Sequence, residues 1–195
     1  MSVACTLITK GRELDCNRIA GGVKFVYFAI FDTTLVTQSF TGGTAGEATD
    51  IAMSGATKLY RYALPRGVSS VTDTLVGSTE NGTVYYTPTI TVIYNNLTAI
   101  DQNEVKLLAK TRLVVFAQLN QQLANGHDVI LCLGAVNGMQ VNAGTELSGA
   151  AWGDQNGYSL TFDGMEQSPM TLVTDYATDP FDNSDGGAAI PIDSN

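Results

Sequence analysis

The chain has 195 residues, of which ten are basic and nineteen acidic, so its net charge is −9. Charged residues make up only 15% and hydrophobic residues 44%, which predicts one folded domain whose surface is covered mainly by uncharged polar side chains. No Lys or Arg follows Arg112, whereas ten carboxylates do. An acidic surface of this kind repels phosphates and argues against specific binding of DNA or RNA.

The start MSVACT lacks a basic region followed by a long apolar stretch, so we expect no secretory signal. No apolar run approaches the roughly 18 residues of a membrane helix, and synthesis in a cytoplasm without a membrane partner is expected. Cys5, Cys16 and Cys132 show no C-x-x-C spacing. We expect these cysteines to be small buried hydrophobic residues and not to form a disulfide framework or a zinc site.

Strand patterns dominate the first half of the chain. Residues 22–33 and 57–64 are rich in Val, Phe, Tyr and Leu. In residues 83–95 (TVYYTPTITVIYN) most even positions are apolar or aromatic and most odd positions bear a hydroxyl, which is the period of two of a strand with two different faces. Asn81-Gly82 precedes this last run, so residues 66–95 are expected to form a long β-hairpin with its tip at residues 80–82. Pro88 has no backbone N–H, which places it at an edge, at a bulge or where pairing is one-sided.

One helix is expected at about residues 101–111, capped by Asp101 with Glu104 three residues later. Strands at 112–119 and 128–134 follow, then a loop containing Gly138 and Gly144. A second hairpin is expected within 147–174 around the turn cluster 153–157, with Trp152 as a packing anchor. Beyond a single domain of residues 1–175, the acidic segment 176–195 has no periodicity and is expected to be an arm.

Residues that carry catalytic chemistry are scarce. His127 is the only histidine and has no nucleophile at a recognisable spacing, and the glycine-rich loop at 42–46 is followed by Glu47, not by Gly-Lys-Ser/Thr. Asp182 and Asp185 lack the spacing of a calcium loop. We therefore expect no enzymatic activity, no cofactor and no metal site.

The order of elements in residues 58–119 resembles that of tail tube proteins of tailed bacteriophages: a strand, a long Ser/Thr-rich hairpin, then the helix NEVKLLAK leading into an apolar strand. Residues 153–170 are similar to the closing strands of such proteins. The resemblance implies a mainly β fold, an antiparallel β-sandwich or half-barrel with one flanking helix. It also implies a virion protein whose hexameric rings close a β-barrel and stack into a tube for DNA ejection.

The implied partners are other copies of the chain and other tail proteins: a terminator, a baseplate and, if the tail contracts, a sheath. DNA would pass as cargo without specific binding. Two alternatives stay open. One is another structural protein of the virion, such as a head decoration protein, a head-tail connector or a tail terminator. The other is a cellular ligand-binding β-sandwich.

Two sets of residues are expected to serve assembly. The apolar face of the hairpin is expected to be buried only in the oligomer, so that Val92→Asp would prevent ring formation; this face comprises Val84, Tyr86, Ile90, Val92 and Tyr94. The channel is expected to be acidic and lined from the two hairpins by Asp73, Glu80, Asp154, Asp163 and Glu166. Arg61 and Arg66 are expected to face the outer wall or subunit contacts, and the arm 176–195 to dock on a neighbouring copy.

Overall fold

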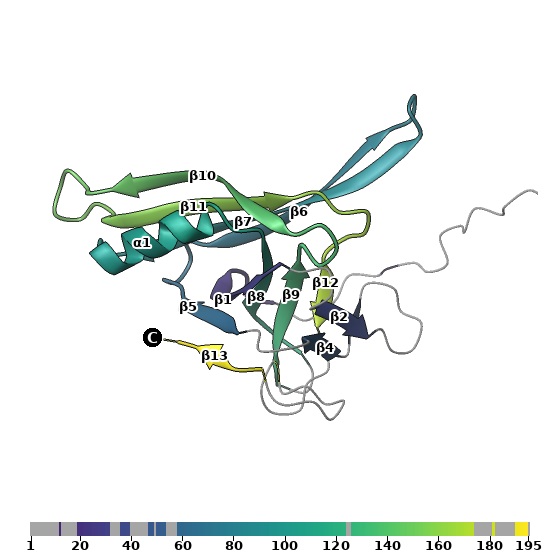
Figure 1. The fold of residues 1–195 in the computed structure, drawn as a ribbon, viewed down its shortest axis with the longest axis horizontal. Helices are drawn as coiled ribbons and strands as arrows, with labels where there is room; N and C mark the ends of the chain where they lie inside the picture. Colours follow the sequence, from purple (N-terminus) through teal and green to yellow (C-terminus); the bar gives the residue numbers. More distant parts are fainter. Residues whose placement is uncertain are drawn as a thin grey trace, which may run out of the picture.

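The structure, a computed structural model, describes residues 12, 19–31, 36–39, 47–48, 50–53, 58–123, 126–173, 181 and 190–194. In this part of the chain the protein is mainly β, with a single helix, and its main sheet curls into a half-barrel that does not close (Figure 1). The expected fold class is therefore confirmed.

The main sheet has two layers. The first runs in spatial order through β13 (Ile192–Asp193), β5 (Leu59–Ala63), β1 (Val23–Ile30), β8 (Leu113–Gln122), β9 (Asp128–Leu133), β12 (Thr171–Val173) and β3 (Glu47–Ala48). The second contains β10 (Met139–Leu147), β11 (Gly157–Gly164), β7 (Thr83–Asn95) and β6 (Ser70–Ser78). Met139 opposite Leu113 joins the two layers. Outside this sheet, β2 (Val36–Ser39) pairs with β4 (Asp50–Met53), and α1 (Ala99–Leu108) follows β7.

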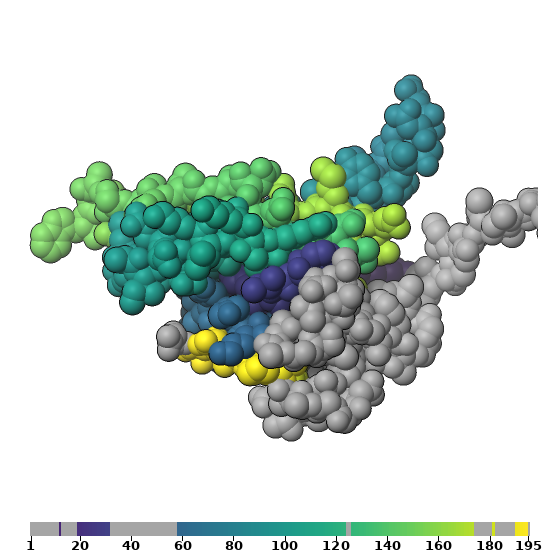
Figure 2. All heavy atoms as spheres, in the orientation of Figure 1, coloured from purple at the N-terminus to yellow at the C-terminus, as the bar shows by residue number. Residues whose placement is uncertain are grey.

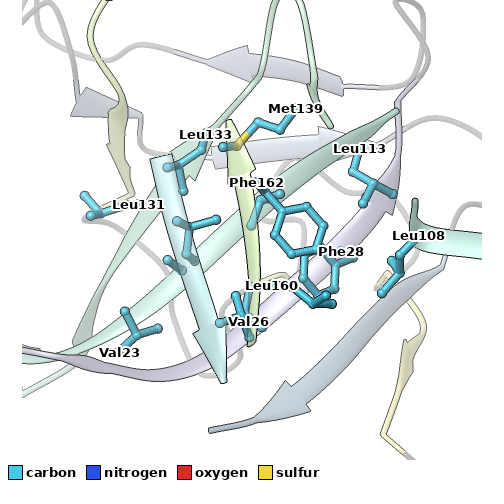
Figure 3. Packing of buried hydrophobic residues seen from close by; sticks show 14 of the residues in the cluster. Val23, Val26, Phe28, Leu108, Leu113, Leu131, Leu133, Met139, Leu160 and Phe162 are labelled. Carbon is cyan, nitrogen blue, oxygen red and sulfur yellow. The ribbon is translucent and has the colours of Figure 1, made fainter. Parts of the chain in front are cut away.

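The two layers enclose the first hydrophobic core. Val26 and Phe28 of β1 face Leu160 and Phe162 of β11, and the rings of Phe28 and Phe162 lie 5.0 Å apart (Figure 3). Leu108 of α1 reaches the same cluster. Alternate residues of each strand thus pack inward, which is the arrangement of a sandwich.

The opposite face of the first layer carries a second core. Tyr27 of β1, Phe116 of β8 and Ile130 of β9 are buried there and are covered by Phe181 and Ile190. Because β1, β8 and β9 are buried on both faces, their sequences read as nearly continuous apolar runs.

The C-terminal segment corrects one expectation. Phe181 is only 3% exposed, its ring lies 5.0 Å from that of Tyr27, and β13 pairs with β5 in parallel. Phe181 and Ile190 therefore belong to the core of their own chain, and β13 adds a strand to its own sheet, so the expected arm that docks on a neighbour is wrong for these described residues.

A polar network ties together the three central strands of the first layer. Asp128 Oδ2 accepts hydrogen bonds from Lys24 Nζ at 2.8 Å and from Gln118 Nε2 at 2.7 Å. The Gln118 side-chain oxygen accepts in turn from the Tyr27 hydroxyl at 2.8 Å. These bonds join β1, β8 and β9 and satisfy polar groups that burial would otherwise leave unpaired.

The strands expected at residues 22–33, 57–64, 83–95, 112–119 and 128–134 are confirmed as β1, β5, β7, β8 and β9. The long hairpin is confirmed as β6 and β7 around a turn at residues 79–82, where Gly82 has a positive φ of 61°. Pro88 pairs with Asp73 of β6 but with no residue of β11, so its pairing is one-sided as expected.

Three details differ from the sequence-based predictions. The helix begins earlier, because Thr98 and not Asp101 is its N-cap: the Thr98 side chain accepts the backbone N–H of Asp101. Residues 139–147, expected to lie in a loop, form β10. The second hairpin is consequently β10 with β11, whereas β12 pairs with β9 and β3.

Candidate assembly surface

The second layer exposes one broad face, opposite the first core. Since Ile90 and Val92 of β7 and Leu160 of β11 point into the core, the residues between them point outward. The outward side chains are mostly hydroxyl-bearing and uncharged. They comprise Ser70, Thr72 and Thr74 of β6, Thr87, Thr89, Thr91 and Ile93 of β7, Ser159, Thr161 and Asp163 of β11, and Gln140, Ala143 and Thr145 of β10. We call this set the hydroxyl face.

The hydroxyl face lacks positive charge. None of β6, β7, β10 and β11 contains a Lys or Arg, although the chain has ten. Asp163 is the carboxylate on the face, and its Oδ2 accepts a hydrogen bond from Asn142 Nδ2 at 2.7 Å. A polyanion would meet hydrogen-bonding groups here but no cation to hold it.

Both edges of the second layer are open in the described part of the chain. On one side β6 pairs only with β7; on the other, β10 pairs with β11 and touches β8 only through Met139. Tyr86 donates its backbone N–H to Glu166 on the β11 side. The alternation of an antiparallel ladder then turns the N–H groups of Asp73 and Leu75 outward, towards the open edge of β6.

The hairpin extends well beyond the cores as a two-stranded ribbon, which projects from one end of the molecule in Figures 1 and 2. Among the described residues, the last backbone pairing of β7 with a segment other than β6 is the Tyr86–Glu166 bridge. Leu75, which pairs with Tyr86, is 60% exposed, and Val84 beyond the bridge is 61% exposed; both lie on the face of the hairpin that continues the core side. The expectation of a hairpin longer than its core is confirmed.

The structure divides the five expected interface residues. Ile90 and Val92 are fully buried in the first core, and Tyr94 packs against it. The expectation that this face is buried only in the oligomer is therefore wrong for Ile90 and Val92, and Val92→Asp is expected to unfold the single chain. Val84 is exposed and Tyr86 half-buried, so these two remain available to a partner.

Two of the expected channel carboxylates have structural roles. Glu166 is only 6% exposed, and its Oε1 accepts the backbone N–H groups of Val136 at 3.3 Å and Asn137 at 2.9 Å. Asp73 lies on the core side of β6 and accepts the N–H of Met170 at 3.0 Å. Placing Glu166 and Asp73 in a channel wall is therefore wrong.

The other three carboxylates are accessible but do not share a surface. Asp163 lies on the hydroxyl face, Glu80 lies in the turn of the ribbon, and Asp154 lies in the β10–β11 loop at the opposite end of the molecule (Figure 2). Asp154 Oδ2 accepts the N–H groups of Ala151 at 2.7 Å and Ala150 at 2.9 Å, and these bonds lower the pKa of its carboxyl. Only Asp163 keeps the position that an acidic lining requires.

Three further residues complete the comparison with the sequence. Trp152, expected to be a packing anchor, is fully exposed at the tip of the β10–β11 loop, so that prediction is wrong. Arg61 and Arg66 are exposed and lie outside the second layer; the Arg61 guanidinium stacks over the Phe25 ring at 5.1 Å. The outward residues of β10 were missed because the strand itself was not predicted.

The described residues contain no group of three or more His, Cys, Asp or Glu side chains placed to hold a metal ion. Among the same residues, no helix is both long and apolar enough to span a membrane. Comparisons with known proteins found no match to this chain among protein-family models, curated proteins or solved structures.

Proposed function

We propose that the chain is a tail tube subunit of a tailed bacteriophage, in which rings of six copies stack around a channel for DNA. The observation that carries this proposal is the second layer: within the described residues it is a four-stranded sheet with two open edges, and its hydroxyl-rich face carries one carboxylate, Asp163, and no Lys or Arg. In the intact virion this tube would contact the terminator, the baseplate and, in a contractile tail, the sheath.

The strand directions support ring closure. Each strand of the second layer is antiparallel to its neighbour, so β10 and β7 run one way and β11 and β6 the other. When copies are related by rotation about a ring axis, β6 of one subunit meets β10 of the next in antiparallel orientation. Such pairing joins the sheets into one barrel and removes every open edge of this layer.

The hydroxyl face suits the wall of a channel for DNA. Duplex DNA carries about one phosphate per 1.7 Å of axis, so even a few cations per ring would add up to strong adhesion along a tube. Threonine and serine hydroxyls stay hydrated and form no ion pairs with phosphate. A wall of this composition guides DNA without holding it.

Negative-stain electron microscopy of the purified protein tests the proposal. Wild type is expected to form rings or tubes of uniform diameter. Leu75→Pro removes an outward N–H of β6 but no N–H that bonds to β7, so this variant is expected to fold and not assemble. Leu75→Thr, which keeps the N–H, is the matched control and is expected to assemble as wild type does.

Monodisperse monomers of wild type at all accessible concentrations would contradict the proposal. Assembly of Leu75→Pro into normal rings would show that the β6 edge does not form the ring contact. Circular dichroism and urea unfolding of each variant establish that a failure to assemble is not a failure to fold.

A further inference from the structure

A pocket of about 460 Å³ opens between α1 and the ends of β5, β7 and β11. Tyrosine side chains line it from three strands: Tyr62 of β5, Tyr94 of β7 and Tyr158 of β11. The rings of Tyr62 and Tyr94 lie 5.3 Å apart and tilted by 49°, so they form two walls and not a flat stack. The helix contributes Asp101 and Glu104 to the same pocket.

Tyr94, one of the residues that line this pocket, has an unsatisfied hydroxyl. Its oxygen is buried and has no hydrogen-bond partner in the part of the chain that the structure describes. Burial, and after it the neighbouring Tyr62 and Asp101, raises the pKa of Tyr94 well above its usual value, so the hydroxyl is neutral at physiological pH. A buried hydroxyl without a partner is rare in a folded protein and is readily explained by a ligand group that bonds to it.

The two carboxylates make the pocket electronegative. Burial first, then Glu104 and Asp101, raise the pKa of Tyr62 to about 12, which shows that both carboxylates act on this ring. Asp101 Oδ2 accepts the Thr98 hydroxyl at 2.6 Å, whereas Glu104 accepts no hydrogen bond within the described residues. Among the described residues, the pocket thus combines a carboxylate that has no ion-pair partner, aromatic faces and a hydroxyl that has no hydrogen-bond partner.

We propose that this pocket binds a primary ammonium group. An ammonium has three donors and no acceptor, which match the Glu104 carboxylate, the Asp101 carboxylate and the Tyr94 oxygen. The rings of Tyr62 and Tyr94 favour a cation over a neutral group, and the apolar Val105 and Leu108 line the pocket where the alkyl chain of such a ligand would lie. The proposal concerns a single subunit and holds whether or not the chain forms a tube.

Fluorescence anisotropy with dansyl-cadaverine, a dye on a five-carbon ammonium chain, tests the proposal. Wild type is expected to bind this probe but not its N-acetylated, uncharged form. Glu104→Gln is expected to weaken binding at least about tenfold, because it removes a charge-assisted hydrogen bond. Glu80→Gln, which removes the same charge from the ribbon turn, is the matched control and is expected to bind as wild type does.

Tyr94→Phe separates binding from folding. Since the Tyr94 hydroxyl has no partner among the described residues, its removal is expected to leave the urea midpoint unchanged or raised while the probe binds several-fold more weakly. Equal binding of the charged and acetylated probes, or undiminished binding by Glu104→Gln, would overturn the proposal.

A second experiment distinguishes two sources of the ammonium group, a lysine of another copy and a free amine. If a lysine of another copy occupies the pocket, excess n-butylammonium will dissociate assembled protein more than sodium at the same ionic strength does. If the natural ligand is a free amine, the two salts will act alike on assembly while dansyl-cadaverine still binds.

Discussion

Glu166 anchors the turn between β9 and β10 by accepting two backbone N–H groups, those of Val136 and Asn137. Replacing it with alanine leaves both amides unpaired, so we expect Glu166→Ala to lower the free energy of unfolding by about 2 kcal/mol. Urea unfolding followed by circular dichroism measures this loss. The control is Glu80→Ala in the exposed ribbon turn, where a change within about 0.5 kcal/mol is expected. Similar losses in both variants would contradict the anchoring role.

Asp128 gives stability a defined dependence on pH. Burial alone would raise the pKa of Asp128, but hydrogen bonds from Lys24 and Gln118 together with the charge of Lys24 outweigh it, and the net effect is a pKa below the usual value. A carboxylate whose pKa is lower in the folded state stabilises the protein fully above its unfolded pKa of about 3.9. That stabilisation is lost as the pH falls through the folded pKa.

We therefore expect the melting temperature of wild type to approach that of Asp128→Asn as the pH falls below about 4, because the carboxylate that distinguishes them becomes protonated. At pH 7 the variant should melt at the lower temperature. Thermal unfolding of both proteins across this pH range measures the difference. A gap that stays constant down to the lowest pH would show that the charge of Asp128 contributes nothing.

Among the elements, β7 was predictable from sequence and β10 was not, for reasons visible in their residues. In β7 the side chains of one face pack in the core and those of the other face are half-exposed, so apolar and polar residues alternate in its sequence. β10 is exposed along most of its length and contains Gly144, where a Cβ would lie 2.9 Å from the Leu160 side chain. In the sequence this glycine resembles a turn residue, but in the structure it leaves room for the Leu160 side chain of β11.

The candidate site was predictable only where the local sequence pattern determines which side of a strand a residue occupies. The alternation of β7 gave the hydroxyl-bearing side of the hairpin correctly. Glu166 and Trp152 were misplaced, because their exposure depends on segments distant in sequence: the β9–β10 turn covers Glu166, whereas nothing in the described chain covers Trp152. The tyrosine pocket was missed for the same reason, since its walls come from three strands and a helix.

The C-terminal segment is expected to stabilise the fold through Phe181. The Phe181 ring packs between Tyr27 and Phe116, with ring centroids 5.0 Å and 5.1 Å away. Truncation to alanine leaves a cavity, so Phe181→Ala should cost about 3–5 kcal/mol in the free energy of unfolding. Urea unfolding measures this, with Ile100→Ala as control because Ile100 is 75% exposed on α1. An unfolding midpoint equal to that of the control would show that Phe181 does not stabilise the fold and that the segment behaves as an arm.

At the scale of the whole molecule, the absence of cations from the second layer is the property that a DNA channel needs. Placing two lysines on the hydroxyl face, Thr89→Lys with Thr161→Lys, is expected to make assembled protein retain duplex DNA at low salt and release it at higher salt. Wild type should retain none. Electrophoretic mobility of DNA incubated with assembled protein measures this.

The matched control adds the same charge elsewhere. Gln102→Lys with Asn103→Lys places two lysines on exposed positions of α1. If this variant retains DNA as strongly as the strand variant does, net charge and not the position of the hydroxyl face governs the interaction.

Trp152 is the only tryptophan in the chain, and its indole stands fully in solvent on a turn that Asp154 holds in shape. The tryptophan emission of this protein therefore reports on a single place, the tip of the β10–β11 loop. As long as the loop is exposed to solvent, the emission is that of a hydrated indole, and an acrylamide quencher reaches the indole freely. Any contact that covers the tip shifts the emission to shorter wavelength and slows quenching. The fluorescence of Trp152 therefore measures, without a label, when another molecule binds at this loop.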